Sequence, residues 1–521
     1  GLVKIDLLGN RSLAVIRDTL ERARARGDAA PDYAALDATS DPRCQAMLAR
    51  GESMGCFYVE SPAMRQLQRR SGCGDFERLV IHSSIIRPAA NEFIRTYLDR
   101  LHGKPWAPVH PELERLLQGT FGLMAYQEDV ARIAIHLAGF SPHEADRLRK
   151  VLAKKTHDYR LADVEARFRA GVRQRGVGPA LEESLWRMLE SFAGYSFCKA
   201  HSASYALVSF KCCWLRDRYP AEFLAAVISN GGGYYSTLGY LGEARRLGIT
   251  PELACVNESD WAWRGSGPKL RVGLAQLRGF RRVAGEALLR AREAGGRFQS
   301  FEDLVTRVPE LERDELTTLA RAGALDALPD AANRARLHWR IRLLGGRGPA
   351  GALFRDTARP LDPEPPQVPD LDEALRLEHE LLAYGIPIRA HPLRLWSPEL
   401  DGLDAVPAAE LERHVGRRVR VCGWLVTAKL VHTKQKDAME FVTLEDTTGL
   451  IEVTVFPRTY ARGAWDLHAP RPVVIEGRVE AEHGVPGLIA TRIESWRGPC
   501  RIAEPRFSTA ADRVEEELLG A

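Results

Sequence analysis

The chain has 521 residues, of which 45% are apolar and 27% charged, so it is a globular sequence too long for one hydrophobic core. Lys and Arg number 73 against 69 Asp and Glu. This near balance excludes a protein that is basic all over, and any basic surface must be local. No apolar run approaches the roughly 20 residues of a membrane-spanning helix, which excludes such a segment.

The nine cysteines are scattered without a paired CxxC framework, which favours a reducing, cytoplasmic setting. The first residue is Gly1, and no signal-peptide pattern follows it. We therefore expect the chain to be part of a longer protein.

The first predicted element is the end of a buried strand over residues 4–9, running into a helix that carries Leu13, Val15, Ile16 and Leu20. Asp6 lies on this strand, where an acid is costly to bury unless it holds a metal ion or another partner. The alternative is that Asp6 is the N-cap of the helix.

Residues 54–60 predict a short β-strand, and residues 81–88 form another apolar segment. From about 111 to 174 the pattern is helical. One helix is predicted to start within 122–128 and another at Ser141 or Pro142. The apolar face of the first carries Val130, Ile133, Ala134 and Leu137.

The second of these helices carries five cations: Arg147, Arg149, Lys150, Lys154 and Lys155. On a helix Lys150 shares a face with both Arg147 and Lys154, and like charges so placed repel. We therefore expect an anion to compensate them. The alternative is a solvated helix face.

Residues 192–214 place Tyr195 and Phe197 before Lys199 and His201, which stand where a long apolar helix begins. Cations at a helix N-terminus are unfavourable unless an anion such as a phosphate binds there. Aromatic side chains nearby would offer faces for bases. The segment therefore indicates nucleotide or nucleic-acid binding, with a capped core helix as the alternative.

After Trp214 a helix is predicted to continue to Ile228, where residues 231–233 break it. A strand, turn and helix follow over 270–294, with a helical pair to 325. The turn at 277–281 resembles the helix-hairpin-helix phosphate-binding turn. Because Arg281 replaces its second glycine, direct backbone contact with DNA is not expected there.

Residues 345–369 are rich in Gly and Pro and predict a linker. Beyond Arg417 the apolar period becomes two, over 419–423, 441–446, 451–456 and 473–479. Short strands so spaced predict a small barrel, with an OB-fold favoured and a ligand-free scaffold barrel as the alternative.

Three motifs carry no function. Ser53 lies in a GxSxG sequence whose predicted strand follows instead of preceding it, which excludes a hydrolase nucleophile elbow. A GxGxxG match over 346–351 lies in the linker without a preceding strand. The residues Cys198, His201, Cys212 and Cys213 do not suit a zinc site, because adjacent cysteines point to different sides of a helix.

The ordered motifs resemble those of bacterial family C DNA polymerases, the alpha subunit of DNA polymerase III, and most closely the error-prone branch. The matching segments are 3–9, 55–64, 86–88, 126–128, 138–155, 192–195, 199–207, 219–223, 256–259, 391–393 and 443–446. The resemblance covers nearly the whole chain. The given residues do not include the family's N-terminal phosphoesterase-like domain or most of its palm.

The resemblance implies roles for individual residues. Asp6 would be the third aspartate of a two-magnesium site whose other ligands lie upstream, and Lys4 would touch the incoming dNTP. In the fingers, the nucleotide would be surrounded by Arg149, Lys150, Lys154, Lys155, Lys199 and His201. The family usually has arginine where Lys150 stands, and lysine lacks the forked geometry that grips phosphate.

The expected fold is multidomain and mainly α-helical, with a C-terminal OB-fold and an N-terminal end of an α/β palm. The expected domains are the palm end (1–12), the fingers (13–260), the helix-hairpin-helix and clamp-binding region (261–345), the linker with a helix (346–410), the OB-fold (411–500) and a tail (501–521).

The chain ends shortly after the barrel, which suggests the error-prone branch. In the linker, residues 350–354 resemble a sliding-clamp peptide with its leading glutamine replaced, and Leu353 and Phe354 would contact the clamp weakly. The expected partners are primer-template DNA, dNTP, the clamp and mutasome proteins. The rival function is a non-catalytic scaffold that binds DNA and clamp. The barrel is also similar to anticodon-binding barrels of class II aminoacyl-tRNA synthetases, but no synthetase-like catalytic segment accompanies it.

Overall fold

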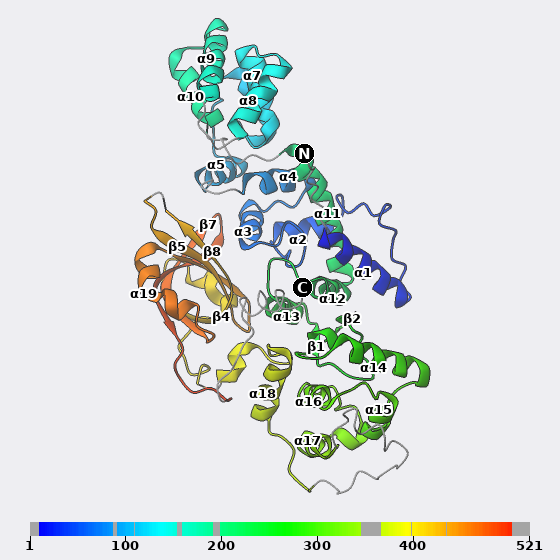
Figure 1. The fold of residues 1–521 in the computed structure, drawn as a ribbon. Helices are drawn as coiled ribbons and strands as arrows, with labels where there is room; N and C mark the ends of the chain where they lie inside the picture. Colours follow the sequence, from blue (N-terminus) through cyan, green and yellow to red (C-terminus); the bar gives the residue numbers. More distant parts are fainter. Residues whose placement is uncertain are drawn as a thin grey trace. The chain divides into compact units, whose positions relative to one another are not determined.

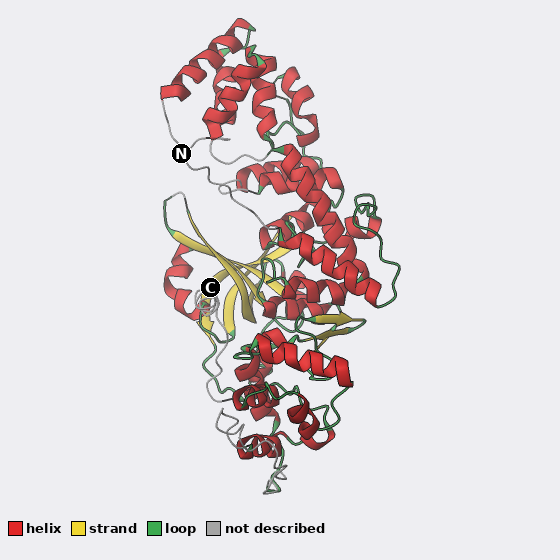
Figure 2. Cartoon of the chain, turned by 45° about the vertical axis from the view of Figure 1, so that its right-hand side comes forward, coloured by secondary structure: helices red, strands yellow, loops and turns green. Residues whose placement is uncertain are grey.

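The computed structural model describes residues 10–86, 91–108, 110–153, 159–190, 198–344, 366–396, 399–433 and 435–502. The described chain forms two units, one of residues 31–217 with 482–485 and the other of the remaining residues. Helical residues outnumber strand residues in both, and the long strands gather in one barrel (Figures 1 and 2). The fold is multidomain and mainly α-helical with a C-terminal barrel, which confirms the predicted class.

The unit of residues 31–217 is helical. Its helices are α2 (Pro42–Ala49), α3 (Pro62–Ser71), α4 (Phe76–Ile85), α5 (Asn91–Leu101), α6 (Pro111–Leu117), η1 (Gln118–Thr120), α7 (Gln127–Ala138), α8 (Pro142–Ala153), α9 (Tyr159–Gln174), α10 (Pro179–Glu190) and most of α11 (Lys199–Arg218). Many begin with proline, which has no N–H to leave unsatisfied at the first helical position. Asp41, Ser61 and Asp75 cap α2, α3 and α4 by accepting N–H bonds.

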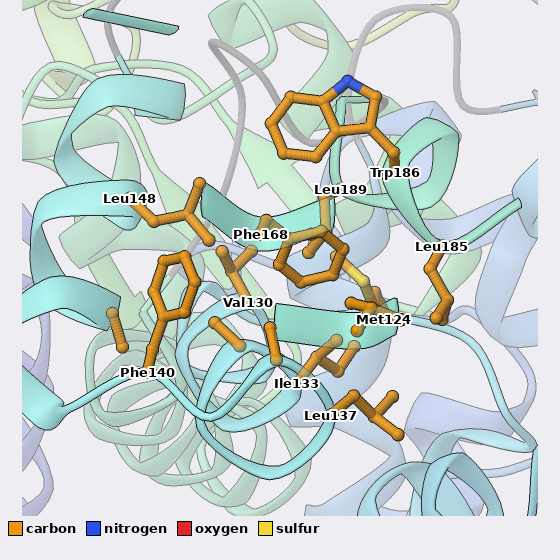
Figure 3. Close-up of a cluster of buried hydrophobic side chains, with 14 of the residues drawn as sticks. Met124, Val130, Ile133, Leu137, Phe140, Leu148, Phe168, Leu185, Trp186 and Leu189 are labelled. Atoms are coloured by element: carbon orange, nitrogen blue, oxygen red, sulfur yellow. The ribbon is translucent and has the colours of Figure 1, made fainter. Parts of the chain in front are cut away.

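Helices α7 to α10 pack around one apolar cluster (Figure 3). The predicted face of α7 is confirmed, because Val130, Ile133, Ala134 and Leu137 are all buried. From α9 and α10, the rings of Phe168 and Trp186 meet with centroids 5.7 Å apart. The sequence period of 3.6 residues thus gives a helical core that holds the charged face of α8 in a fixed orientation.

A buried histidine joins α3, α4 and α5. His82 Nδ1 lies 2.8 Å from the amide oxygen of Gln68 on α3, and its Nε2 lies 3.3 Å from the hydroxyl of Tyr97 on α5. Burial lowers the pKa of His82 from its ordinary value to about 3. The imidazole is therefore neutral at physiological pH.

The buried His82 predicts that the free energy of unfolding decreases at acidic pH. The unfolded chain takes up a proton near pH 6.5, whereas folded His82 does so only near pH 3, so stability falls as the pH drops through that window. We expect the wild type to lose up to about 1.4 kcal/mol per pH unit more than His82→Gln does. Amide hydrogen exchange of the α3, α4 and α5 peptides from pH 7.5 to 4.5, corrected for the intrinsic exchange rate at each pH, measures it. The exposed His143→Gln is the control, and identical pH profiles of wild type and His82→Gln would contradict the prediction.

The other unit contains the remaining elements. Its helices are α1 (Arg11–Ala25), α12 (Pro220–Ser229), α13 (Thr237–Arg246), η2 (Leu274–Gln276), α14 (Arg282–Gly295), α15 (Phe301–Arg307), α16 (Arg313–Arg321), η3 (Pro329–Ala331), α17 (Arg334–Leu343), α18 (Glu373–Tyr384), η5 (Pro392–Trp396), η6 (Ala408–His414) and α19 (Pro457–Leu467). On α1, Val15, Ile16 and Leu20 are buried as expected, but Leu13 is exposed. A small sheet of β1 (Thr250–Glu252), β2 (Arg264–Ser266) and β3 (Lys269–Arg271) has the order β1-β3-β2.

The barrel closes in the order β4-β5-β6-β8-β7. Its strands are β4 (Arg418–His432), β5 (Ala438–Glu445), β6 (Leu450–Val455), β7 (Val473–Glu482) and β8 (Val485–Ser495). The β6–β8 pairing is parallel, and β4 pairs antiparallel with both β5 and β7. Alternate residues such as Val442, Leu444 and Val453 fill the core. The sequence predicts four of the strands and misses β8.

Two local predictions are wrong. Residues 54–60 form a tight turn instead of a strand, because the Glu60 carboxylate accepts the Gly55 N–H and the Ser53 hydroxyl donates to the Val59 carbonyl. The helix after Trp214 does not continue to Ile228. It ends at Arg218, and Pro220 begins α12, because proline cannot continue the backbone bonding of a helix but suits its first turn.

Candidate nucleic-acid interface

The start of α7 is fixed by a buried carboxylate. Asp129 accepts hydrogen bonds from the backbone N–H groups of Ala125 (3.0 Å) and Tyr126 (2.9 Å). Burial raises the pKa of Asp129, and these two bonds oppose that shift. The bonds set the entry of the chain into the helix, so that Gln127 and Glu128 occupy its first turn.

The charged face of α8 meets this turn through Arg149. The Arg149 guanidinium donates to the side-chain oxygen of Gln127 at 2.8 Å and pairs with Asp146 at 2.8 Å. Lys150 pairs with the other oxygen of Asp146 at 2.7 Å. Hydrogen bonds from Lys150 and Arg149 lower the pKa of the Asp146 carboxyl. Asp146, on the same helix, therefore supplies part of the negative charge that we expect beside these cations.

Lys199 reaches the same turn from α11. Its backbone N–H donates to both carboxylate oxygens of Glu128, at 3.2 and 3.1 Å. Its ammonium group lies 5.4 Å from the centroid of the Tyr126 ring and 3.9 Å from the Glu77 carboxylate. Glu128 thus meets part of the need for an anion at this helix start. Arg149 and Lys199, far apart in the sequence, are both held at the start of α7.

His201 lies in the first turn of α11 beside an aromatic cluster. Its ring contacts Tyr205 in a tilted arrangement with centroids 4.1 Å apart, and Tyr205 meets both Phe57 and Tyr58 edge-on at 5.1 Å. Tyr58 has φ 70°, in the left-handed region that bulky residues rarely adopt. Such outliers gather at functional sites. The Ser202 and Ser84 hydroxyls, 2.8 Å apart, link α11 to the end of α4.

Sequence reasoning missed these aromatic partners. The contact between His201 and Tyr205 follows from their i, i+4 spacing on a helix, which is visible in the sequence. Phe57 and Tyr58 give no such signal, because the sequence predicts a strand where the structure has a turn.

The barrel presents a second aromatic surface. Phe441 is 42% exposed on the outside of β5, where the strand register places it between Lys429 of β4 and Thr454 of β6. Lys429 is exposed as well. A ring flanked by a cation on a barrel strand suits a base and its phosphate.

In the helix-hairpin-helix turn, the polar groups of Arg281 contact other residues of the protein. Gly279 has φ 70°, whereas Arg281 is extended at the N-cap of α14. The Arg281 N–H donates to Glu315 at 3.2 Å, and its guanidinium pairs with Glu315 (2.9 Å) and Glu312 (2.8 Å). The side chain that replaces the second glycine thus engages protein carboxylates.

Eight predicted residues lie outside the described residues: Lys4, Asp6, Lys154, Lys155, Tyr195, Phe197, Leu353 and Phe354. Residues 1–9 of the predicted palm end at 1–12 also lie there. Among the residues that the structure describes, no group of three His, Cys, Asp or Glu side chains could hold a metal ion. The same part of the chain has no helix long and apolar enough to cross a bilayer. The magnesium site therefore stays a prediction based on Asp6.

Three family models match the chain. Residues 12–176 match the bacterial DNA polymerase III alpha subunit finger domain, residues 248–337 a helix-hairpin-helix motif, and residues 419–495 an OB-fold nucleic acid binding domain. The first contains Arg149 and Lys150, and the third contains Lys429 and Phe441.

Similar curated proteins are polymerases. The chain is 34% identical to an error-prone DNA polymerase of Symbiobacterium thermophilum over 95% of the chain and 49% of the relative. It is 35% identical to one of Anaeromyxobacter dehalogenans, over 98% and 46%. It is 33% identical to the DNA polymerase III subunit alpha of Thermus aquaticus, over 92% and 40%. The chain spans about half the length, or less, of these relatives.

Proposed function

Because this chain belongs to the family of bacterial DNA polymerase III alpha subunits, we propose that it forms the fingers and DNA-binding part of a template-directed DNA polymerase of the error-prone type. The reaction would transfer a nucleotide from dNTP to a primer 3′-OH. The observation that carries the proposal is that Arg149 and Lys199 both contact the first turn of α7.

These cations suit a triphosphate. The side chains of Arg149 and Lys199 are both partly exposed, so they can contact a phosphate without leaving their protein partners. Charge that develops on the leaving pyrophosphate would be stabilised by fixed cations and by the N-terminus of α11. A phosphate at that N-terminus would compete with Glu128. Lys150, His201 and, outside the described residues, Lys4, Lys154 and Lys155 are proposed to complete the pocket.

Magnesium is the proposed cofactor. Asp6 would hold it together with carboxylates outside this chain, and the ion would supply the charge that activates the primer oxygen and stabilises pyrophosphate. The residues of this chain would position the nucleotide and the template. We therefore expect the 521 residues alone not to extend a primer.

DNA binding by this chain tests the proposal most directly. We expect primed and single-stranded oligonucleotides to bind, with log affinity falling by about 0.7 per log salt for each single-strand phosphate contact. Lys199→Ala should weaken binding and reduce this slope, whereas Lys199→Arg should keep both the affinity and the slope of the wild type. Fluorescence anisotropy between about 50 and 200 mM salt measures both.

The exposed Arg187→Ala is the matched control, because Arg187 pairs with Glu183 on α10. Binding that is absent or insensitive to salt would contradict the proposal. So would equal effects of Lys199→Ala and Arg187→Ala.

The sliding clamp and other mutasome proteins are further proposed partners. Leu353 and Phe354 can fill an apolar pocket, but the missing glutamine removes hydrogen bonds worth about 0.5–1.5 kcal/mol each. We expect weak clamp binding that Leu353→Ala with Phe354→Ala abolishes in a calorimetric titration. Unchanged affinity would show that this peptide is only linker.

A further inference from the structure

The outer face of α19 carries a tryptophan that is almost fully in water. Trp465 is 94% exposed. The inner face packs on the barrel through Leu467 and Gly463, where a Cβ would stand 2.7 Å from the Ile493 Cβ. Because this contact fixes the rotation of the helix, Arg458, Arg462 and Trp465, at i, i+4 and i+7, share the outward face.

The two arginines of this face are unbalanced. Within the described part of the chain, neither Arg458 nor Arg462 forms an ion pair, whereas Arg420 and Arg492 of the same barrel pair with Glu476 and Glu494. An exposed indole beside two arginines that form no ion pair with described residues favours a partner that is both planar and anionic. Bases that stack and phosphates that carry charge make single-stranded nucleic acid such a partner.

The face continues the aromatic surface of the barrel. Phe441 lies opposite Thr454 on β6, and two residues farther along the chain Phe456 is 46% exposed at the N-cap of α19. Trp465 lies eight residues beyond Pro457, which is about 12 Å along the helix. Exposed rings thus mark a path from Phe441 past Phe456 to Trp465, with cations beside it.

We propose that the Arg458–Arg462–Trp465 face binds a single strand of DNA and extends the binding path beyond the strands of the barrel. The inference rests on the proposed function, because it assigns a longer path to the same DNA ligand. It predicts that the barrel holds more nucleotides than its strand face alone can cover.

A length series of labelled oligothymidine tests the inference on the full chain. We expect wild-type affinity to keep rising over about two to three nucleotides after the affinity of Trp465→Ala has levelled off. With long oligonucleotides Trp465→Ala should bind at least about fivefold more weakly, and Trp465→Phe should lie between. Arg458→Gln with Arg462→Gln should reduce the salt slope.

Two controls separate the face from general effects. Trp339→Ala removes a tryptophan of α17 that is 44% exposed, and Arg413→Gln removes an exposed arginine of η6; both should bind as the wild type does. Equal affinity of wild type and Trp465→Ala at every length overturns the inference and leaves the proposed function standing. The same holds if Trp465→Ala abolishes capture of a polyglutamate peptide while DNA affinity is unchanged, which would make the face a protein-binding site. If the wild type shows no salt-dependent DNA binding, both the inference and the proposed function are overturned.

Discussion

Replacing Asp6 by asparagine is expected to abolish primer extension by this chain once it is joined to an N-terminal segment that supplies the rest of the palm, with a loss of at least about 1000-fold in rate. Asparagine keeps the size of the side chain but removes its charge. A two-magnesium site depends on carboxylates to fix the ions. Each tenfold loss is about 1.4 kcal/mol of barrier, so removing one ligand worth several kcal/mol suffices.

The structure excludes the alternative that Asp6 is the N-cap of the first helix. That helix begins at Arg11, and the Asn10 side chain accepts the Ser12 N–H at 3.0 Å. The N-cap position is therefore filled by Asn10. A change at Asp6 acts on something other than the capping of α1.

Asn10→Ala is the matched control for this experiment. It should lower stability by about 1 kcal/mol and leave the extension rate unchanged, because it removes a cap and no ligand. Single-turnover primer extension and thermal unfolding of the same preparations separate the two effects. Robust extension by Asp6→Asn, or by the 521 residues alone, would contradict the catalytic assignment.

Much of the fold follows from local sequence periodicity. The apolar face of α7 and the alternation of β5 and β6 are each set by neighbouring residues, so the pattern predicts them. The turn at 54–60 does not follow from the pattern. The hydrogen bond from the Gly55 N–H to the Glu60 carboxylate, five residues along the chain, overrides the strand propensity of this apolar run.

The candidate site is predictable in its residue types but not in its partners. Cations at the start of α11 and along α8 are visible in the sequence, as is Tyr205 one turn after His201. The bond from Lys199 to Glu128 spans 71 residues, and no spacing rule reveals it. Asp146 could have been identified as the partner of Arg149 and Lys150, since i, i+3 and i, i+4 pairs share a helix face.

The barrel is joined to α13 by a buried ion pair, which carries the second large expected effect. The carboxylate of Glu445, at the end of β5, pairs with the Arg246 guanidinium, which also pairs with Glu243 at 2.8 Å. A Cβ at Gly242 would lie 1.9 Å from a Glu445 oxygen, so any larger residue at this point of α13 would displace the carboxylate. His391 lies 3.8 Å from the same carboxylate.

Arg246→Ala is expected to lower the free energy that holds the barrel on α13 by about 3–5 kcal/mol, because it leaves the buried Glu445 charge without its main partner. Arg246→Met combined with Glu445→Met should restore part of the loss, since the Glu445 charge is then no longer buried, whereas the buried Glu243 loses its ion pair with Arg246 in both variants. The exposed pair of Arg420 and Glu476 is the control, and Arg420→Ala should cost less than about 1 kcal/mol. A chain of several domains need not unfold in one step, so amide hydrogen exchange of the α13 and β5 peptides is the suitable measurement. If Arg246→Ala speeds exchange in those peptides no more than Arg420→Ala does, the ion pair does not hold the barrel in place.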